Sequence, residues 1–171
     1  MGEKNIIIVR KYHSPCGELT LGSFGEELCL CDWQSGLHRS RTIVRLQRML
    51  DAELEYGTSR LIDMAASQLD EYFAGARRTF DIPLLFSGTE FQRTVWHELL
   101  KIPYGTTVSY GTIARNIGMP KAIRAVANAN GANPISIFAP CHRVIGSDNS
   151  LTGYGGGLEV KEFLLILENA F

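Results

Sequence analysis

The hydrophobic pattern predicts strands followed by one helix up to a boundary near residue 85, and helices with loops after it, which favours an α+β fold. Before it, segments 5–14 and 18–33 are rich in β-branched and aromatic residues and are separated by the turn signal SPCG. This pattern is typical of a small antiparallel meander. Between Ser59 and Ala74 the apolar residues recur at helical spacing, and Gly75 is a suitable stop. We therefore expect a small N-terminal antiparallel sheet with one helix.

The segment after residue 85 predicts helices joined by loops. An apolar helical face containing Val95 and Trp96 ends at IPYG, and Ser109 can cap a short helix that Gly118 ends. Pro120 is suited to begin the next helix, so the tight GMP turn predicts a helix-turn-helix. We interpret ARRTFDIPLLFSG as a linker. The chain then divides into an N-terminal domain at 1–84 and a mostly helical C-terminal domain at 85–171.

Composition and the N-terminus restrict the compartment. The 171 residues suit one globular unit or two small ones. Only four consecutive apolar residues precede Arg10, too few for a signal peptide or a membrane span, so we expect a cytoplasmic protein without a membrane partner. Its four cysteines should then be reduced. Cys29 and Cys31, two positions apart on a strand, are expected to face one side and pack in the core.

Charge is segregated along the chain although the net charge is only −1. From 101 to 147 there is no acidic residue, and five basic residues predict a cationic surface suited to phosphates: Lys101, Arg115, Lys121, Arg124 and Arg143. A helical wheel of the second helix of the predicted helix-turn-helix places Ile123, Val126 and Ala127 on the side that faces the rest of the C-terminal domain. The opposite face would then meet a narrow DNA groove with Lys121, Ala122, Arg124, Ala125, Asn128 and Ala129. An ordinary alanine-rich surface helix is the alternative.

The segment PCHRVIG at 140–146 places a cysteine beside a histidine. Such a pair can be a metal ligand set, a nucleophile with its base, or part of a buried loop. The absence of any CxxC pair argues against zinc. The residues alone leave the other two alternatives open.

The C-terminal half resembles the O6-alkylguanine-DNA alkyltransferase family through PCHRV, the downstream GYGGG and the helix KEFLLILE. The N-terminal half matches more loosely, through SPCGELTLG and QLDEYFAGARRTFDIPL. The resemblance implies DNA repair by irreversible, single-turnover transfer of a small alkyl group from O6-alkylguanine in double-stranded DNA to Cys141. It implies base flipping, a monomer and no cofactor, and it leaves O4-alkylthymine open as a second substrate.

The resemblance also assigns roles to residues. Cys141 would accept the alkyl group, with His142 and Glu168 as its activating relay and Asn133 linking the helix-turn-helix to the active-site loop. Tyr110 and Arg124 would handle the extruded nucleotide and the place it leaves. The expected pocket residues are Val144, Tyr154, Gly155, Gly156 and Lys161.

Three positions depart from the pattern of some family members. Gly155 replaces a serine, which removes a side-chain hydrogen bond to the guanine oxygen, and Ser136 replaces a proline that lines the pocket. Phe24 occupies the place of one zinc ligand, so we predict no metal.

Two other functions compete with this interpretation. A cysteine hydrolase using Cys141 and His142 would need an oxyanion hole, which the sequence does not clearly contain. A lesion-sensing DNA-binding module without enzymatic activity would not need the acceptor cysteine, which is present.

Overall fold

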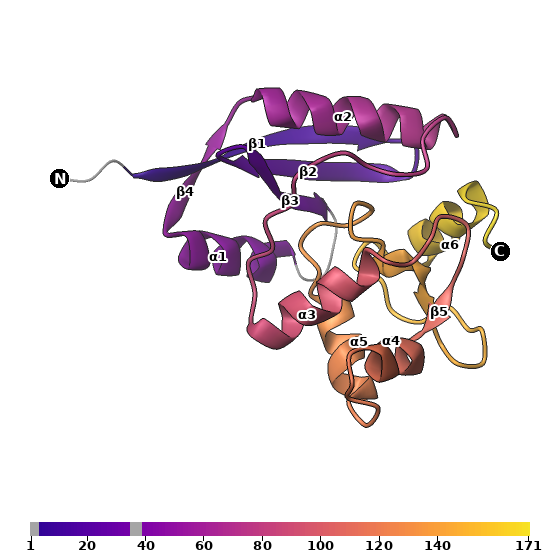
Figure 1. Ribbon diagram of the computed structural model, residues 1–171. Coiled ribbons are helices and arrows are strands. Elements are labelled where there is room, and N and C mark those ends of the chain that lie inside the picture. Colours follow the sequence, from indigo (N-terminus) through magenta and orange to yellow (C-terminus); the bar gives the residue numbers. More distant parts are fainter. Residues whose placement is uncertain (1–3, 35–38) are drawn as a thin grey trace.

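A computed structural model describes residues 4–34 and 39–171, in which a sheet packs against a helical part (Figure 1). The sheet order is β3-β2-β1-β4. Its strands are β1 (Asn5–Ser14), β2 (Gly17–Phe24), β3 (Glu27–Trp33) and β4 (Ala52–Tyr56). The first three form the expected antiparallel meander, whereas β4 pairs parallel with β1. The sheet is therefore mixed.

Two helices cover the sheet, one on each face (Figure 1). Helix α1 (Arg39–Leu50) and strand β4 were not expected from the sequence. Strand β4 is short and carries two glutamates, so its pattern is not typical of a strand. Helix α2 (Arg60–Phe73) confirms the predicted periodicity. It begins after Ser59, whose side chain accepts from the amide of Ile62, and Gly75 follows it with a φ of 76°.

A β-bulge in β3 overturns the prediction that Cys29 and Cys31 share a face. The register with β2 skips Cys29, so this residue is the extra one on its strand. Cys29 consequently packs with Ile7 and Leu46 in the cluster beneath α1. Cys31 lies in the main core on the other face. Both thiols are fully buried, as expected.

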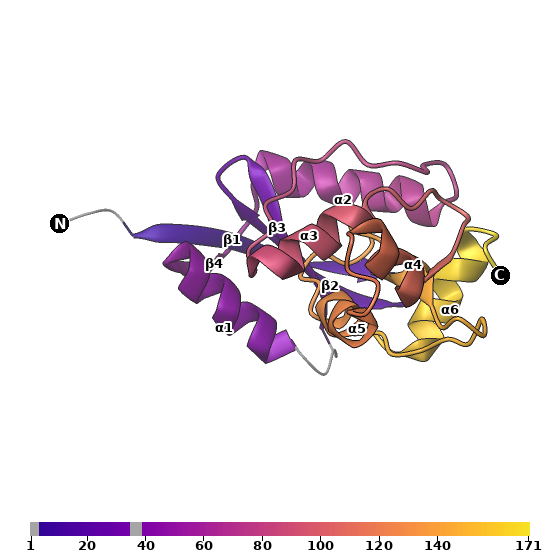
Figure 2. The same ribbon diagram turned by 60° about the horizontal axis from the view of Figure 1, so that its bottom comes forward.

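The C-terminal part contains four α-helices, which lie together in Figure 2, and two short strands. The helices are α3 (Glu90–Leu99), α4 (Tyr110–Asn116), α5 (Ile123–Gly131) and α6 (Leu158–Leu167). Strands β5 (Val108–Ser109) and β6 (Val144–Ile145) pair in parallel. Ser109 caps α4 and Gly118 follows it with a φ of 77°, so α4 and α5 form the predicted helix-turn-helix. Helix α5 begins three residues later than Pro120 suggested.

The outer edge of β3 joins the two parts of the chain. The amide of Leu28 donates to Pro83 and the amide of Leu85 donates to Leu28, each at 2.8 Å, so the predicted linker runs along this edge. Further along the same edge, Cys31 exchanges two backbone hydrogen bonds with the segment 134–136. Sheet edges offer unpaired amides and carbonyls, and here they hold the segment that leads to the PCHRVIG loop.

The main hydrophobic cluster draws residues from both sides of residue 85, including Leu21, Leu69, Trp96 and Leu164. Trp96 is fully buried and donates its indole N–H to the carbonyl of Ala129, which confirms its expected packing role. None of the helices within residues 4–34 and 39–171 combines the length and the apolar composition of a membrane span.

Candidate functional site

Cys141 begins a 3-10 turn (Cys141–Arg143) directly after Pro140 and is almost fully buried. Two asparagines at the end of α5 hold this loop. Asn130 donates to the carbonyl of Cys141, and Asn133 donates to the carbonyl of Ala139 at 2.9 Å. The side-chain oxygen of Asn133 also accepts from the amide of Ile135 at 3.0 Å. Asn133 thus links the helix-turn-helix to the cysteine loop, in the arrangement that the resemblance implied.

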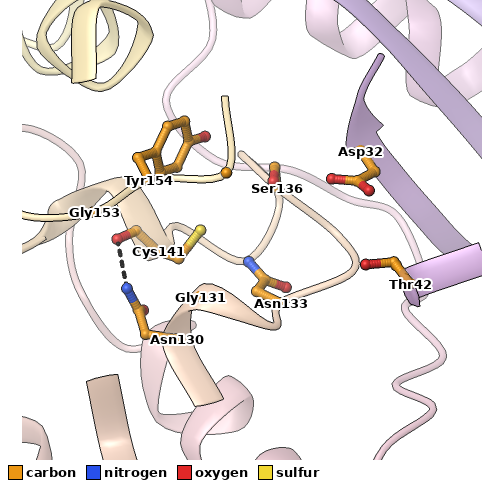
Figure 3. A pocket seen from close by; sticks show the side chains of 10 residues that line it. Asp32, Thr42, Asn130, Gly131, Asn133, Ser136, Cys141, Gly153 and Tyr154 are labelled. Carbon is orange, nitrogen blue, oxygen red and sulfur yellow. Dashed lines mark hydrogen bonds between the residues drawn. The ribbon is translucent and has the colours of Figure 1, made fainter. Parts of the chain in front are cut away.

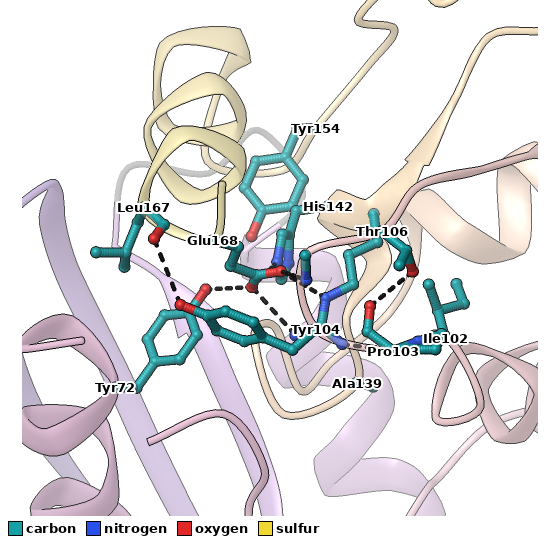
Figure 4. A network of polar contacts seen from close by, with 12 residues as sticks. Tyr72, Ile102, Pro103, Tyr104, Thr106, Ala139, His142, Tyr154, Leu167 and Glu168 are labelled. Carbon is teal, nitrogen blue, oxygen red and sulfur yellow. Dashed lines mark hydrogen bonds and ion pairs between the residues drawn. The ribbon is translucent and has the colours of Figure 1, made fainter. Parts of the chain in front are cut away.

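His142 and Glu168 form a fully buried pair, with Nε2 of the imidazole 2.7 Å from Oε2 of the carboxylate (Figure 4). An ionised carboxylate can only accept, so Nε2 carries the hydrogen. The other ring nitrogen, Nδ1, then carries the lone pair, and it has no hydrogen-bond partner within the described part of the chain. The pairing therefore produces the tautomer in which Nδ1 can act as a base.

Arg143 also binds the carboxylate of Glu168. Its Nε donates to Oε1 of Glu168 at 2.8 Å and its Nη2 to Oε2 at 3.1 Å, a bidentate contact. Glu168 caps the C-terminus of α6, where the helix dipole disfavours negative charge, and the guanidinium offsets this. The expectation that Arg143 belongs to a cationic surface is wrong, because the side chain is buried and pairs with Glu168.

Tyr72 of α2 donates its hydroxyl to Oε2 of Glu168 at 2.5 Å, and the amide of Gly105 donates to Oε1 at 3.3 Å (Figure 4). Burial raises the pKa of Glu168, but the hydrogen bonds and charges of His142 and Arg143 outweigh it and hold the pKa well below its ordinary value. Glu168 is consequently ionised throughout the neutral range.

The thiol and the imidazole are both neutral near pH 7. Burial raises the pKa of Cys141, although the hydrogen bond from Asn133 and the charge of Lys161 oppose this. Burial also lowers the pKa of His142, and the charges of Arg143 and Lys161 add to that effect, against the influence of Glu168. The thiolate is therefore not preformed, and its formation requires a base.

A small pocket lies beside Cys141 and has a volume of about 20 Å³, enough for one water molecule (Figure 3). Asn133, Ser136 and the Gly153–Gly155 segment line one part of it, and Asp32 and Thr42 face them from the N-terminal part. A larger groove of about 690 Å³ shares Tyr154 and the glycine segment with this pocket. It also reaches Asn128 of α5. The thiol thus lies behind a groove that runs to the helix-turn-helix.

The glycine-rich wall is held by an N-terminal tryptophan. The indole N–H of Trp33 donates to the hydroxyl of Tyr154 at 3.0 Å. A Cβ atom on Gly156 would come within 2.9 Å of three atoms of the Trp33 ring, so this close approach requires glycine. Tyr154 and Gly155 line the pocket as expected, whereas Gly156 lies behind it against Trp33.

Two further expected pocket residues also lie outside the lining. Val144 is fully buried and pairs with Val108 in the small sheet. Lys161 is fully buried too, and its Nζ donates to the carbonyls of Val144 and Thr152 at 2.7 Å each. Lys161 therefore braces the loops on either side of the pocket and does not contact its interior.

Tyr110 lies at the N-terminus of α4 and lines the groove. The hydroxyl of Thr152 donates to its oxygen at 2.9 Å, which leaves the phenolic hydrogen free for another acceptor. Burial raises the pKa of Tyr110, against the hydrogen bond from Thr152, so the phenol stays protonated at neutral pH.

The exposed face of α5 differs from the helical wheel at two positions. Lys121, Arg124, Ala125 and Asn128 are exposed and Ala122 is half-buried, as a contact surface requires. Ala129 is only 3% exposed and packs in the core, so its predicted groove contact is wrong. Ile123, expected to face the domain, is 48% exposed. The wheel assumed a helix in isolation, whereas α3 and α4 both pack on α5 and select its buried side.

No group of three or more His, Cys, Asp or Glu side chains that could hold a metal occurs in residues 4–34 and 39–171. The expectation of a metal-free protein remains a prediction.

The sequence missed several residues around the site: Asp32, Trp33, Tyr72, Asn130 and Arg143. Asn130 had a usable signal, since it lies in the last turn of α5, three residues before Asn133, which lies just beyond the end of the helix. Arg143 is adjacent to the histidine and was treated as a surface cation. The other three come from the N-terminal part, and nothing local in the sequence marks their contact with the loop.

Comparisons with known proteins find relatives over the whole chain. Residues 7–86 match the family model "6-O-methylguanine DNA methyltransferase, ribonuclease-like domain", and residues 90–170 match "6-O-methylguanine DNA methyltransferase, DNA binding domain". A Methylated-DNA--protein-cysteine methyltransferase of Mycobacterium tuberculosis is 43% identical, covering 96% of this chain and 94% of its own length. One of Methanosarcina acetivorans is 58% identical over 106 residues, covering 62% of this chain and 68% of its own.

A solved structure resembles the whole fold. The crystal structure of Mycobacterium tuberculosis OGT in complex with DNA superposes with a TM-score of 0.82 at 44% identity, covering 95% of this chain and 93% of that one. The fold is therefore α+β, with the sheet first and the helical part second.

Proposed function

The chain belongs to the O6-methylguanine DNA methyltransferase family, and on that premise we propose that Cys141 takes alkyl groups from O6-alkylguanine in double-stranded DNA. The protein is a methylated-DNA--protein-cysteine methyltransferase that acts in direct-reversal DNA repair, and DNA is its partner. The assignment of individual residues to steps of the reaction is our proposal.

One observation carries the assignment of the acceptor. Cys141 lines the pocket beside the groove, whereas Cys16, Cys29 and Cys31 line neither, and His142 of the buried His142–Glu168 pair follows Cys141 directly in the chain. The other three thiols are also within the described residues. Cys29 and Cys31 are fully buried in apolar clusters, and Cys16 lies beside Ser14, away from the pocket.

The first chemical step removes the thiol proton. His142, neutral and with Nδ1 unprotonated, accepts this proton through a bridging water, and Glu168 stabilises the imidazolium that forms. The charge of Lys161 and the hydrogen bond from Asn133 favour the thiolate. A soft sulfur nucleophile then attacks the alkyl carbon in line with the departing oxygen.

The second part of the step releases guanine. The carbon–sulfur bond forms as the bond from carbon to O6 breaks, and the bonding electron pair stays with the base. Tyr110 donates its free phenolic hydrogen to the base, and the proton held by His142 restores the phenol through solvent. The thiol proton thus ends on guanine. A thioether has no easy route back to a thiol, so each molecule reacts once.

DNA binding uses the exposed side of α5. Arg124 and Lys121 supply cationic groups, and the small side chains of Ala122 and Ala125 with Asn128 permit close approach to a narrow groove. O6 of a stacked guanine cannot reach a buried thiol, so the nucleotide must leave the duplex, at a cost of a few kcal/mol. Arg124 occupies the vacated space and recovers part of that cost by stacking.

The pocket favours small alkyl groups. Its volume of about 20 Å³ is too small for a purine, so the groove wall must move when the base enters. Gly155 offers no side-chain donor to O6, which leaves backbone amides for that role. We also propose a division into domains at residue 85 and action in the cytoplasm. Activity on O4-alkylthymine is a further candidate for the same pocket.

Intact-mass measurement tests the proposal most directly. Mixing the protein with duplex DNA that contains O6-methylguanine should add one methyl group per molecule and then stop. Cys141→Ala should gain no methyl group and still bind the DNA, because α5 is unchanged. Cys16→Ala is the matched control and should react normally. Methylation of the Cys141→Ala variant would disprove the assignment, and multiple turnover on an ester would favour a hydrolase instead.

A further inference from the structure

The Glu168 carboxylate receives one hydrogen bond from outside the C-terminal part. Tyr72, on α2 and 96 residues earlier in the chain, donates its hydroxyl to Oε2 at 2.5 Å (Figure 4). This is the same oxygen that accepts from His142. Tyr72 is fully buried, so the contact is shielded from solvent.

The ring of Tyr72 would pack equally well without its hydroxyl. It contacts the rings of Phe73, Phe80 and Tyr104, with centroids 5.2 to 6.3 Å away. Phenylalanine could make all three contacts. A buried hydroxyl costs free energy unless it finds a partner, and here the partner is the carboxylate beside the catalytic histidine.

The direction of this hydrogen bond is determined by the groups involved. Glu168 is ionised and can only accept, so the phenol must donate. Burial raises the pKa of Tyr72, and the charge of Glu168 and its hydrogen bond raise it further. The phenol therefore remains a donor throughout the neutral and moderately alkaline range.

The phenol limits how strongly Oε2 attracts the imidazole proton. Oε2 accepts from Tyr72, His142 and Nη2 of Arg143, so its negative charge is shared among three donors. We propose that Tyr72 is a positioning residue for alkyl transfer, holding the Glu168 carboxylate where it orients His142 without trapping a proton on it. This inference rests on the proposed function, since it assigns His142 the role of base.

Other ionisable groups surround His142 and must be considered with Tyr72. Glu168 favours the imidazolium, whereas Arg143 and Lys161 disfavour it. Cys141 precedes it in the 3-10 turn, and the ring of Tyr154 lies nearby (Figure 4). Among the groups that donate to Oε2, only the phenol of Tyr72 can be removed by substitution without loss of a charge or of the base.

Tyr72→Phe in the full chain tests the inference. We expect alkyl transfer at saturating DNA to slow by about tenfold, in the range found when outer partners of active-site groups are removed. DNA affinity should be unchanged. Without the phenol, Oε2 keeps more negative charge and favours the imidazolium, so the pKa of His142 rises. The acid limb of the pH–rate profile should therefore move to higher pH.

Tyr12→Phe is the matched control. Tyr12 is also a buried tyrosine of the N-terminal part, and its hydroxyl donates to Asp70 at 2.6 Å. Within the described residues, the Asp70 side chain makes no hydrogen bond or ion pair with Cys141, His142 or Glu168, so this variant should keep the wild-type rate and pH profile even if it loses similar stability. A fluorinated tyrosine at position 72, a stronger donor that keeps the fold, should move the acid limb to lower pH.

The outcomes separate the two proposals. If wild-type protein gains no methyl group from O6-methylguanine DNA, the proposed function fails. If wild-type protein reacts and Tyr72→Phe keeps its rate and acid limb, only the role of Tyr72 fails. An equal loss of rate in Tyr72→Phe and Tyr12→Phe, with no displacement of the acid limb, would reduce Tyr72 to a structural residue.

Discussion

Replacing Glu168 by glutamine should destabilise the fold by an amount that depends on pH. The substitution keeps the shape of a side chain that is completely buried and accepts hydrogen bonds from Tyr72, His142 and Arg143. It leaves the Arg143 guanidinium buried without a counter-charge. Removing one partner of a buried ion pair costs about 3–5 kcal/mol. At roughly 2–4 °C per kcal/mol for a chain of this size, Tm should fall by about 6–20 °C.

The pH dependence follows from the depressed pKa of Glu168. A carboxyl whose pKa is lower in the folded chain stabilises the fold fully above its unfolded pKa, which is about 4.3. That stabilisation is lost as the pH falls below this value, because the unfolded chain takes up the proton first. The difference in unfolding free energy between wild type and Glu168→Gln should therefore persist from pH 7 down to about pH 4 and shrink below about pH 4.

Urea unfolding followed by tryptophan fluorescence at several pH values between 7 and 3 measures this difference. Glu53→Gln is the control, because Glu53 pairs with Lys4 in an exposed ion pair that contributes little. A constant difference between wild type and Glu168→Gln from pH 7 to pH 3 would refute the reasoning. A loss at pH 7 no larger than that of the control would refute it as well.

Three other substitutions test separate parts of the structure. Arg124→Ala should slow repair of duplex DNA strongly and leave the reaction with free O6-methylguanine nearly unchanged, and it should lower the salt slope of DNA binding by about one unit. Equal losses of rate on both substrates would contradict the proposal that Arg124 takes the place of the flipped base. Gly156→Ala should lower the unfolding free energy by about 1–3 kcal/mol, because the added Cβ atom clashes with Trp33. Gly155→Ala should not, because a Cβ atom there has no neighbour within 4 Å. Urea unfolding of the two variants compares these losses. Ser109→Ala should cost about 1 kcal/mol in the same assay by uncapping α4, and an unchanged midpoint would rule out the cap.

Local patterns in the sequence predicted the elements that local physics controls. Ser109 caps α4 as predicted, Ser59 caps α2 at the start of the predicted helical segment, and Gly75 and Gly118 follow helices with positive φ, because a cap depends on only a few neighbouring residues. Lys161 and Glu168, seven residues apart at helical spacing, lie on one side of the last helical segment, and both are buried. The missed helix α1 and strand β4 have short or weakly patterned sequences whose structure depends on packing against the sheet.

The family resemblance pointed to the residues that we propose to react, but not to the side chains that surround them. Cys141, His142 and Glu168 were found through a motif, and the motif carries no information about the N-terminal part. Tyr72 and Trp33 contact the site because the two parts of the chain share a hydrophobic core and the edge of β3 holds the segment 134–136.

By itself, the sequence determined the change from strands to helices and the ends of α2 and α4, since each depends on residues close together in the chain. The role expected for the PCHRVIG loop came from the family resemblance. Tertiary structure alone decided that Arg143 is a buried counter-ion, that Ala129 faces the core and that Cys29 leaves the face of Cys31. Burial and hydrogen-bond partners depend on which distant elements meet. A periodic pattern can show that a helix has an apolar side, but the elements that pack on it select which residues lie inside.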